Sequence, residues 1–182
     1  MNISAEIDKT AEGDAQYPGQ RTDSSGEKEA IYDSEVCTRR HIDRIRFLLA
    51  KCASVLLERG IQHDASKLEP AEKAAFDGMG NRHLEVTYGS EEYMTSLAGL
   101  KTALDHHYAH NPHHPEHYPN GINGMSLFDL VEMLMDWKAT AEGHVGGADI
   151  ERCLEIARKR FGISDQLIQI LANTAKELGW MS

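Results

Sequence analysis

Residues 60 to 67 read Gly-Ile-Gln-His-Asp-Ala-Ser-Lys, and the rest of the chain is arranged around the His63-Asp64 pair within this stretch. A histidine beside an aspartate offers a metal ion one imidazole nitrogen and one carboxylate oxygen. Neighbouring side chains on a helix point about 100° apart, so both reach one ion only at a helix end or in an irregular turn. Gly60 predicts such a break just before the pair.

Apolar residues recur at three- and four-residue steps on both sides of this stretch, the spacing of amphipathic helices. The first helix is predicted over residues 34–59, with Ser34 as its N-cap. Its apolar stripe comprises Val36, Ile42, Ile45, Leu48, Leu49, Cys52, Val55 and Leu56. The later helices are predicted over residues 70–76, 90–107, 126–142, 149–160 and 164–178. With no strand-period segment and no glycine-rich phosphate loop, the sequence predicts an all-α fold, a single-domain bundle of about six helices.

Further metal-binding side chains lie on either side of the pair. His41 falls near the edge of the first apolar stripe, and six histidines crowd between His106 and His117. The third predicted helix brings either His106 or His107 inward, since two neighbours on a regular helix do not point the same way.

Proline and glycine forbid a regular helix over residues 111–124, so this segment is a predicted functional loop. Its histidines are surface groups, an adventitious metal-binding tract or site ligands, and their position between two core helices favours the site. On the following helix, Asp129 and Glu132 fit a solvated face as well as an inward one. Asp136 lies between Met135 and Trp137, and an inward carboxylate has to be paired or bind a metal.

Composition limits the class of protein. The hydrophobic fraction is 41%, no apolar run approaches the roughly 20 residues of a membrane span, and no secretory signal is recognised at the N-terminus. Three separated cysteines indicate reduced thiols and a cytoplasmic location. The net charge of -10 argues against non-specific binding to nucleic acid. Composition predicts a disordered acidic tail over residues 1–33. Residues 34–182 are predicted to form a folded helical metal-binding domain.

The ordered histidines and aspartates resemble the HD-domain superfamily of metal-dependent phosphohydrolases, whose ligand positions are matched here by His41, His63, Asp64 and Asp136. The segment His63-Asp64-Ala65-Ser66-Lys67 resembles the HDxxK form of the HD-GYP branch. The glycine before Tyr118 is missing and Asn120 follows Tyr118-Pro119, so cyclic-dinucleotide specificity is not carried over.

Residues 36 to 178 also resemble an uncharacterised bacterial and phage family, a domain of unknown function. The shared residues are His63-Asp64 with Ser66-Lys67, His106-His107-Tyr108, Asn111, His113-His114-Pro115-Glu116 and the stretch from Glu132 to Ala139. This second resemblance brings no activity with it, so function has to be argued from the site.

The HD resemblance implies one divalent transition metal (Mn, Fe, Co, Ni or Zn) held by His41, His63, Asp64 and Asp136. One of His106 and His107, together with His114, would hold a second ion or bind phosphate. Lys67 would stabilise phosphoryl oxygens, and Asp64, Glu72 or a loop histidine would relay a proton. The expected reaction is hydrolysis of a small phosphorylated substrate such as a nucleotide, and the oligomeric state stays open. The alternatives are a di-iron oxygenase, since some members of the superfamily hold two irons with four histidines and two aspartates, or a non-catalytic binding protein with a structural metal.

Overall fold

The computed structural model describes residues 33–80, 86, 90–143 and 149–181. These residues form seven α-helices and three short 3-10 helices, with no strand among them, as the all-α prediction requires. The predicted disordered tail lies outside the described residues. The chain divides into two compact units, Met1–Val55 and Leu56–Ser182, and the boundary falls inside the first described helix, α2.

Helix α2 (Ser34–Gln62) is longer than predicted. Its N-cap is Asp33 rather than Ser34, because the Asp33 carboxylate accepts hydrogen bonds from the backbone N–H groups of Glu35 and Val36, at 2.9 and 3.2 Å. Gly60 does not break the helix, so the predicted end at residue 59 is wrong by three residues. A single glycine inside a helix costs only about 1 kcal/mol, which the flanking turns outweigh.

The chain turns at Asp64 itself. Its backbone has φ 56° and ψ 17°, the only positive φ of a non-glycine residue among those described. Aspartate is one of the few residues that tolerate this left-handed conformation. The turn leads into the short helix η1 (Ala65–Leu68) and then α3 (Pro70–Met79), where Pro70 occupies the first turn, as predicted, although the helix continues past Phe76.

The single helix predicted over residues 90–107 is two helices, α5 (Glu91–Ala98) and α6 (Lys101–His110), which meet at Gly99. Ser90 caps α5 by accepting a hydrogen bond from the Tyr93 N–H. The following segment, called the His loop here (residues 111–118), contains the short helix η2 (Pro115–His117), and η3 (Gly121–Gly124) comes after it. The prolines therefore exclude a regular helix, as expected.

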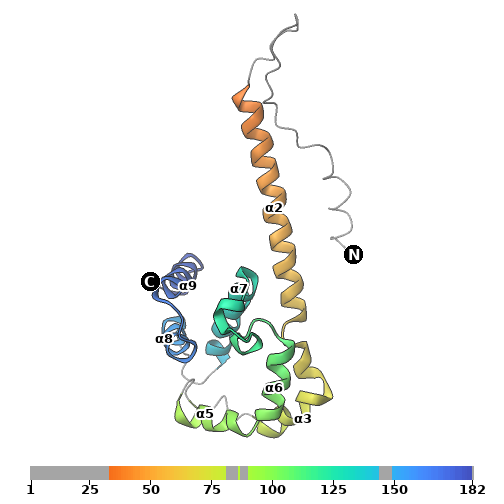
Figure 1. The fold of residues 1–182 in the computed structure, drawn as a ribbon, viewed down its shortest axis with the longest axis vertical. Helices are drawn as coiled ribbons and strands as arrows, with labels where there is room; N and C mark the ends of the chain where they lie inside the picture. Colours follow the sequence, from red (N-terminus) through yellow and green to blue (C-terminus); the bar gives the residue numbers. More distant parts are fainter. Residues whose placement is uncertain (1–32, 81–85, 87–89, 144–148, 182) are drawn as a thin grey trace, which may run out of the picture. The chain divides into compact units, whose positions relative to one another are not determined.

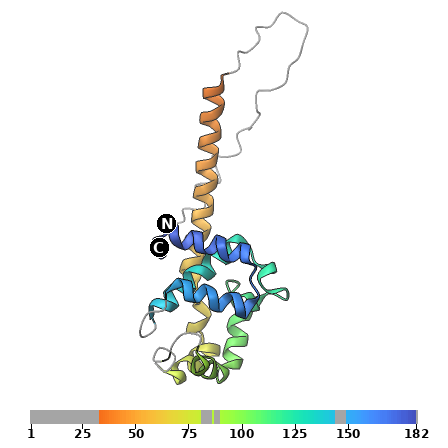
Figure 2. The same cartoon turned by 90° about the vertical axis from the view of Figure 1, so that its left-hand side faces the viewer.

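The core of the second unit is built by α7 (Leu127–Gly143), α8 (Ile150–Phe161) and α9 (Asp165–Glu177). Asp149 and Ser164 cap α8 and α9 through the N–H groups of Arg152 and Leu167. The three helices lie together in both views (Figures 1 and 2), with α8 in contact with each of the other two. Their shared interior comprises Met133, Leu134, Trp137, Ala141, Ile150, Cys153, Leu154, Ala157, Ile163, Leu171 and Ala175.

A second group of helices carries the turn at Asp64. Helix α3 packs against both η1 and α6, and α6 also contacts η2 of the His loop. This packing brings the Asp64 turn, the end of α6, the His loop and one face of α7 to the same place. Of the helices described, none is long and apolar enough to cross a membrane.

Candidate metal centre

Two imidazole nitrogens lie close to one oxygen of Asp64, and a third lies beside them. Asp64 Oδ1 lies 3.2 Å from His107 Nε2 and 3.5 Å from His113 Nε2. His114 Nε2 lies 2.9 Å from His107 Nε2. The four residues come from the turn before η1, from α6 and from the His loop, and their ligand atoms all lie within 4.8 Å of one another. We call them the nitrogen-rich group.

The other oxygen of Asp64 belongs to a second group. Asp64 Oδ2 lies 3.6 Å from His63 Nε2, and Asp136 Oδ1 on α7 lies 3.7 Å from the same nitrogen. His63, Asp64 and Asp136 form what we call the oxygen-rich group. Asp64 thus bridges two adjacent sets of ligands with its two carboxylate oxygens.

Both groups fit a transition metal. Ligand atoms held at about 2.0–2.2 Å from one ion lie roughly 3.0–3.5 Å from each other, close to the separations found here. Asp64 Oδ1 and His113 Nε2 are buried and make no hydrogen bond with any described residue. Leaving a buried carboxylate oxygen and a ring nitrogen without partners is costly, and a cation between them would satisfy both.

Glu72 on α3 orients the histidines of α6. Its carboxylate is completely buried, and its two oxygens accept hydrogen bonds from His106 Nδ1 at 2.7 Å and His107 Nδ1 at 2.9 Å. With Nδ1 protonated, the lone pair of His107 Nε2 points at Asp64 and His114. Burial alone would raise the pKa of the Glu72 carboxyl, but these two imidazoles lower it, so the group stays ionised.

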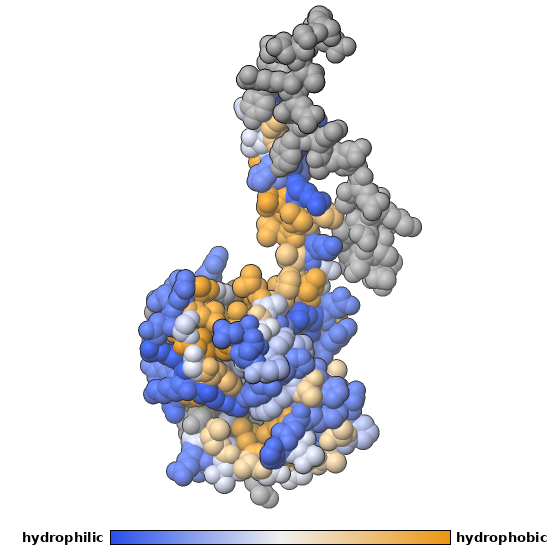
Figure 3. All heavy atoms as spheres, viewed as in Figure 1, coloured by the Kyte–Doolittle hydropathy of each residue, from blue (hydrophilic) through white to orange (hydrophobic). Residues whose placement is uncertain are grey.

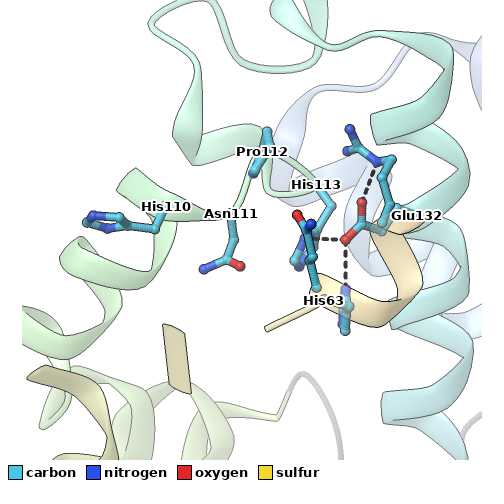
Figure 4. A pocket seen from close by; sticks show the side chains of 8 residues that line it. His63, His110, Asn111, Pro112, His113 and Glu132 are labelled. Atoms are coloured by element: carbon cyan, nitrogen blue, oxygen red, sulfur yellow. Dashed lines mark hydrogen bonds and ion pairs between the residues drawn. The ribbon is translucent and has the colours of Figure 1, made fainter. Parts of the chain in front are cut away.

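Glu132 on α7 orients one histidine of each group. Its Oε1 accepts from His63 Nδ1 at 2.8 Å and lies 3.0 Å from His113 Nδ1 (Figure 4). The other oxygen, Oε2, accepts from Arg59 Nε at 2.7 Å. Arg59 also donates to Asp129, which is buried. Both imidazoles and Glu132 line a small pocket of about 130 Å³.

The surroundings shift the pKa values of several of these groups. Burial raises the pKa of the Asp64 carboxyl, but the Lys67 ammonium, which donates a hydrogen bond to Oδ2, is among the groups that lower it below its usual value. The carboxylate of Asp136 raises the pKa of His63 to about 9, because its effect outweighs burial, which lowers the pKa. Burial lowers the pKa of His114 to about 3, so that ring is neutral and offers a lone pair.

Depth separates the two groups. His107 and His113 are only 2% and 1% exposed, whereas His63 is 27% and Asp136 19% exposed. Lys67 stands at the outer side, with its ammonium 2.6 Å from Asp64 Oδ2 and 39% of its side chain exposed. A ligand from solvent therefore meets Lys67 and the oxygen-rich group first.

The structure brings most of the predicted ligands together, namely His63, Asp64, His107, His114 and Asp136. His106 faces Glu72 instead, which resolves the choice between it and its neighbour. His41 belongs to neither ligand group: it is exposed, and it lies on the same helix as Gln62 rather than on a separate preceding helix.

The sequence left open which of His113 and His114 faces the site and whether Glu132 points inward, and it gave no role to Arg59; the structure brings both histidines into one ligand group. The signal for Glu132 was its spacing, because it lies one helical turn before Asp136 and therefore shares its face. No local pattern marks Arg59, whose partners are 70 and 73 residues away. Glu72 was predicted as a proton relay, but its position behind His106 and His107 suits orientation of the imidazoles.

A family model described as a family of unknown function (DUF5662) matches residues 30–177, which is most of the chain. The protein therefore belongs to that family. Neither the curated proteins nor the solved structures contain a match.

Proposed function

We propose that this member of a family of unknown function is a phosphohydrolase that depends on two divalent transition-metal ions. The observation that carries the proposal is the bridging position of Asp64, with one oxygen in each ligand group. Paired metal ions about 3.5–4 Å apart are typical of enzymes that displace a group at phosphorus. The mixed nitrogen and oxygen donors suit Mn, Fe, Co, Ni or Zn.

Two metal ions would supply Lewis acidity, which lowers the pKa of a coordinated water to about 7 and draws charge from phosphoryl oxygens. The protein contributes position and charge. His107 and His113 are fixed by Glu72 and Glu132, so their nitrogens are aimed before any ion binds. With only three donors among the described residues, the oxygen-rich group leaves coordination positions open for substrate.

Lys67 is the proposed phosphate-binding residue. Its ammonium stands at the exposed side of Asp64, and it would move from that carboxylate to the phosphoryl oxygens of a substrate such as a nucleotide. We assign no proton relay to Asp64 or Glu72. Asp64 would use both oxygens as ligands, and both oxygens of Glu72 already accept hydrogen bonds from imidazoles.

The test combines metal analysis with turnover. We expect up to two equivalents of metal in the wild-type protein, none in Asp64→Ala and about one in Asp136→Ala, because only Asp64 is shared. Lys67→Ala should keep the metal and lose release of phosphate from a panel of phosphoesters. Lys73→Ala removes an exposed lysine whose ion pair among the described residues is with Asp77, and it should behave as wild type. Full metal in Asp64→Ala, or unchanged turnover in Lys67→Ala, would contradict these assignments.

One observation favours a second candidate, a di-iron oxygenase. The two groups together hold four histidines and two aspartates: His63, His107, His113, His114, Asp64 and Asp136. This is the donor set of the di-iron members in the resembling superfamily. Two equivalents of iron with an oxygen-dependent optical change, and no phosphate release from the panel, would select this activity instead.

A further inference from the structure

The stripe along α2 carries an inference that is independent of the metal centre. No residue of this helix is buried. Even its large apolar side chains are open to solvent: Ile42, Ile45, Leu48 and Leu49 are 40% to 63% exposed. The space-filling view shows apolar side chains gathered along the helix (Figure 3). Exposed apolar patches of this kind mark interaction surfaces.

The spacing of the stripe points to a helical partner. Ile42, Ile45, Leu49, Cys52 and Leu56 follow one another at steps of three, four, three and four residues. This is the a/d repeat of a two-stranded coiled coil, in which each side chain enters a hole on the facing helix. The same repeat is present on every copy of the chain, so the stripe is complementary to itself.

We propose that this stripe is the interface with a second copy of the chain, and that the two α2 helices pair in parallel. In this in-register arrangement each of the five layers is apolar. The flanking g-to-e′ pairs are His41 with Arg46, Leu48 with Ala53 and Val55 with Gly60. Small residues at 53 and 60 allow the helices to approach closely. An antiparallel pairing that matches Ile42 with Cys52 would set Leu56 against Thr38 and bury a hydroxyl group.

The charges beside the stripe do not oppose this pairing. Arg39 is bound to Glu35 at 2.6 Å and Arg46 to Asp43 at 3.3 Å, each within its own helix. All four side chains are at least 70% exposed. Their charges are therefore compensated locally, which reduces repulsion between the arginines of the two copies.

The area is sufficient for a reversible dimer. Burying a Val, Leu or Ile side chain removes roughly 60–120 Å² from water, so the seven apolar residues from 42 to 56 would bury on the order of 500 Å² per copy. Stable interfaces begin at about 600 Å² per partner. The dimer should accordingly dissociate on dilution.

The test measures the mass of the full chain by sedimentation equilibrium at several concentrations. We expect a concentration-dependent dimer. Leu49→Glu should convert it to a monomer, because the new charge would lie in the middle of the stripe, between the two helices. Leu57→Glu makes the same change on the same helix at a residue that is 71% exposed and off the stripe, and it should leave the dimer intact. A monomeric wild type would overturn the proposal and assign the stripe to an intramolecular partner. A dimer that survives Leu49→Glu would place the interface elsewhere.

The exposed thiol of Cys52 tests the direction of pairing. In a parallel pair, Cys52 of one chain lies opposite Cys52 of the second chain, at a distance that a disulfide spans. Mild oxidation should then produce a covalent dimer in the wild type and in Cys37→Ser, but not in Cys52→Ser. Failure of a dimeric protein to cross-link through Cys52 would overturn the parallel register.

Discussion

Glu132→Gln tests whether one carboxylate orients histidines of both proposed metal sites. The change keeps the size of the side chain and removes its charge. Glu132 Oε1 accepts a hydrogen bond from His63 of the oxygen-rich group and lies 3.0 Å from Nδ1 of His113 in the nitrogen-rich group. An amide has one oxygen and one NH₂ group. If its oxygen faces the two imidazoles, it accepts less strongly than a carboxylate and its NH₂ group faces the donor of Arg59; if it turns round, the NH₂ group faces the imidazoles.

The expected size follows from the two contacts. Loss of an outer hydrogen-bond partner of a metal-bound histidine weakens binding about 10- to 100-fold, which is roughly 1.4–2.7 kcal/mol. Because Glu132 serves one imidazole in each group, both ions should bind more weakly by this factor. The fold should persist, since Arg59 keeps its ion pair with Asp129.

The assay is competition with a chromophoric chelator, with metal content and the helical circular dichroism signal followed in parallel. Glu142→Gln is the matched control, because Glu142 lies on the same helix and is 63% exposed, and within the part of the chain that the structure describes its ion pair is with Lys138. If Glu132→Gln binds both ions within twofold of wild type, or weakens only one of them, a shared orienting role for Glu132 is refuted.

Three further predictions concern strain, protonation and burial. A Cβ added at Gly124 would lie 2.7 and 2.8 Å from Tyr118 side-chain atoms, so Gly124→Ala should lower the free energy of unfolding by about 1–3 kcal/mol. Gly78→Ala, with open space around it in α3, should be neutral or slightly stabilising in the same denaturation assay. The metal-free pKa of His63 is about 9, so an ion entering the oxygen-rich group at pH 7 should expel about one proton, and affinity should rise between pH 7 and 9. Calorimetry in buffers of different ionisation enthalpy measures that proton, and a buffer-independent heat would contradict it. Burial raises the pKa of Cys153 to about 11, so its thiol should alkylate only after unfolding, as peptide mapping would show.

Local patterns were enough for the helices and for the centre of the site. Periodic apolar residues predicted an all-α chain, and the helix starts at Pro70, Ser90, Asp149 and Ser164 were recognised because a cap depends on neighbours within three residues. The His63-Asp64 pair was likewise evident, since adjacent residues need no folding to be near each other.

The ends and breaks of helices were harder to predict from the sequence. Gly60 resembles a helix stop in sequence but lies within α2, and Gly99 resembles an interior residue but divides α5 from α6. A glycine lowers the stability of either conformation by similar small amounts, so packing of the flanking turns decides between them.

Tertiary structure alone chose among the histidines. His106 and His107 are equivalent in sequence, and Glu72, about 35 residues away, accepts from both while only His107 meets Asp64. The contacts of Arg59 with α7 span some 70 residues of sequence. Such pairs depend on how α3, α6 and α7 pack together, and no local spacing encodes that packing. The sequence by itself therefore determined the helical class and the His63-Asp64 pair at the centre of the site. The packing placed the two Asp64 oxygens in different groups and decided which side chains surround them.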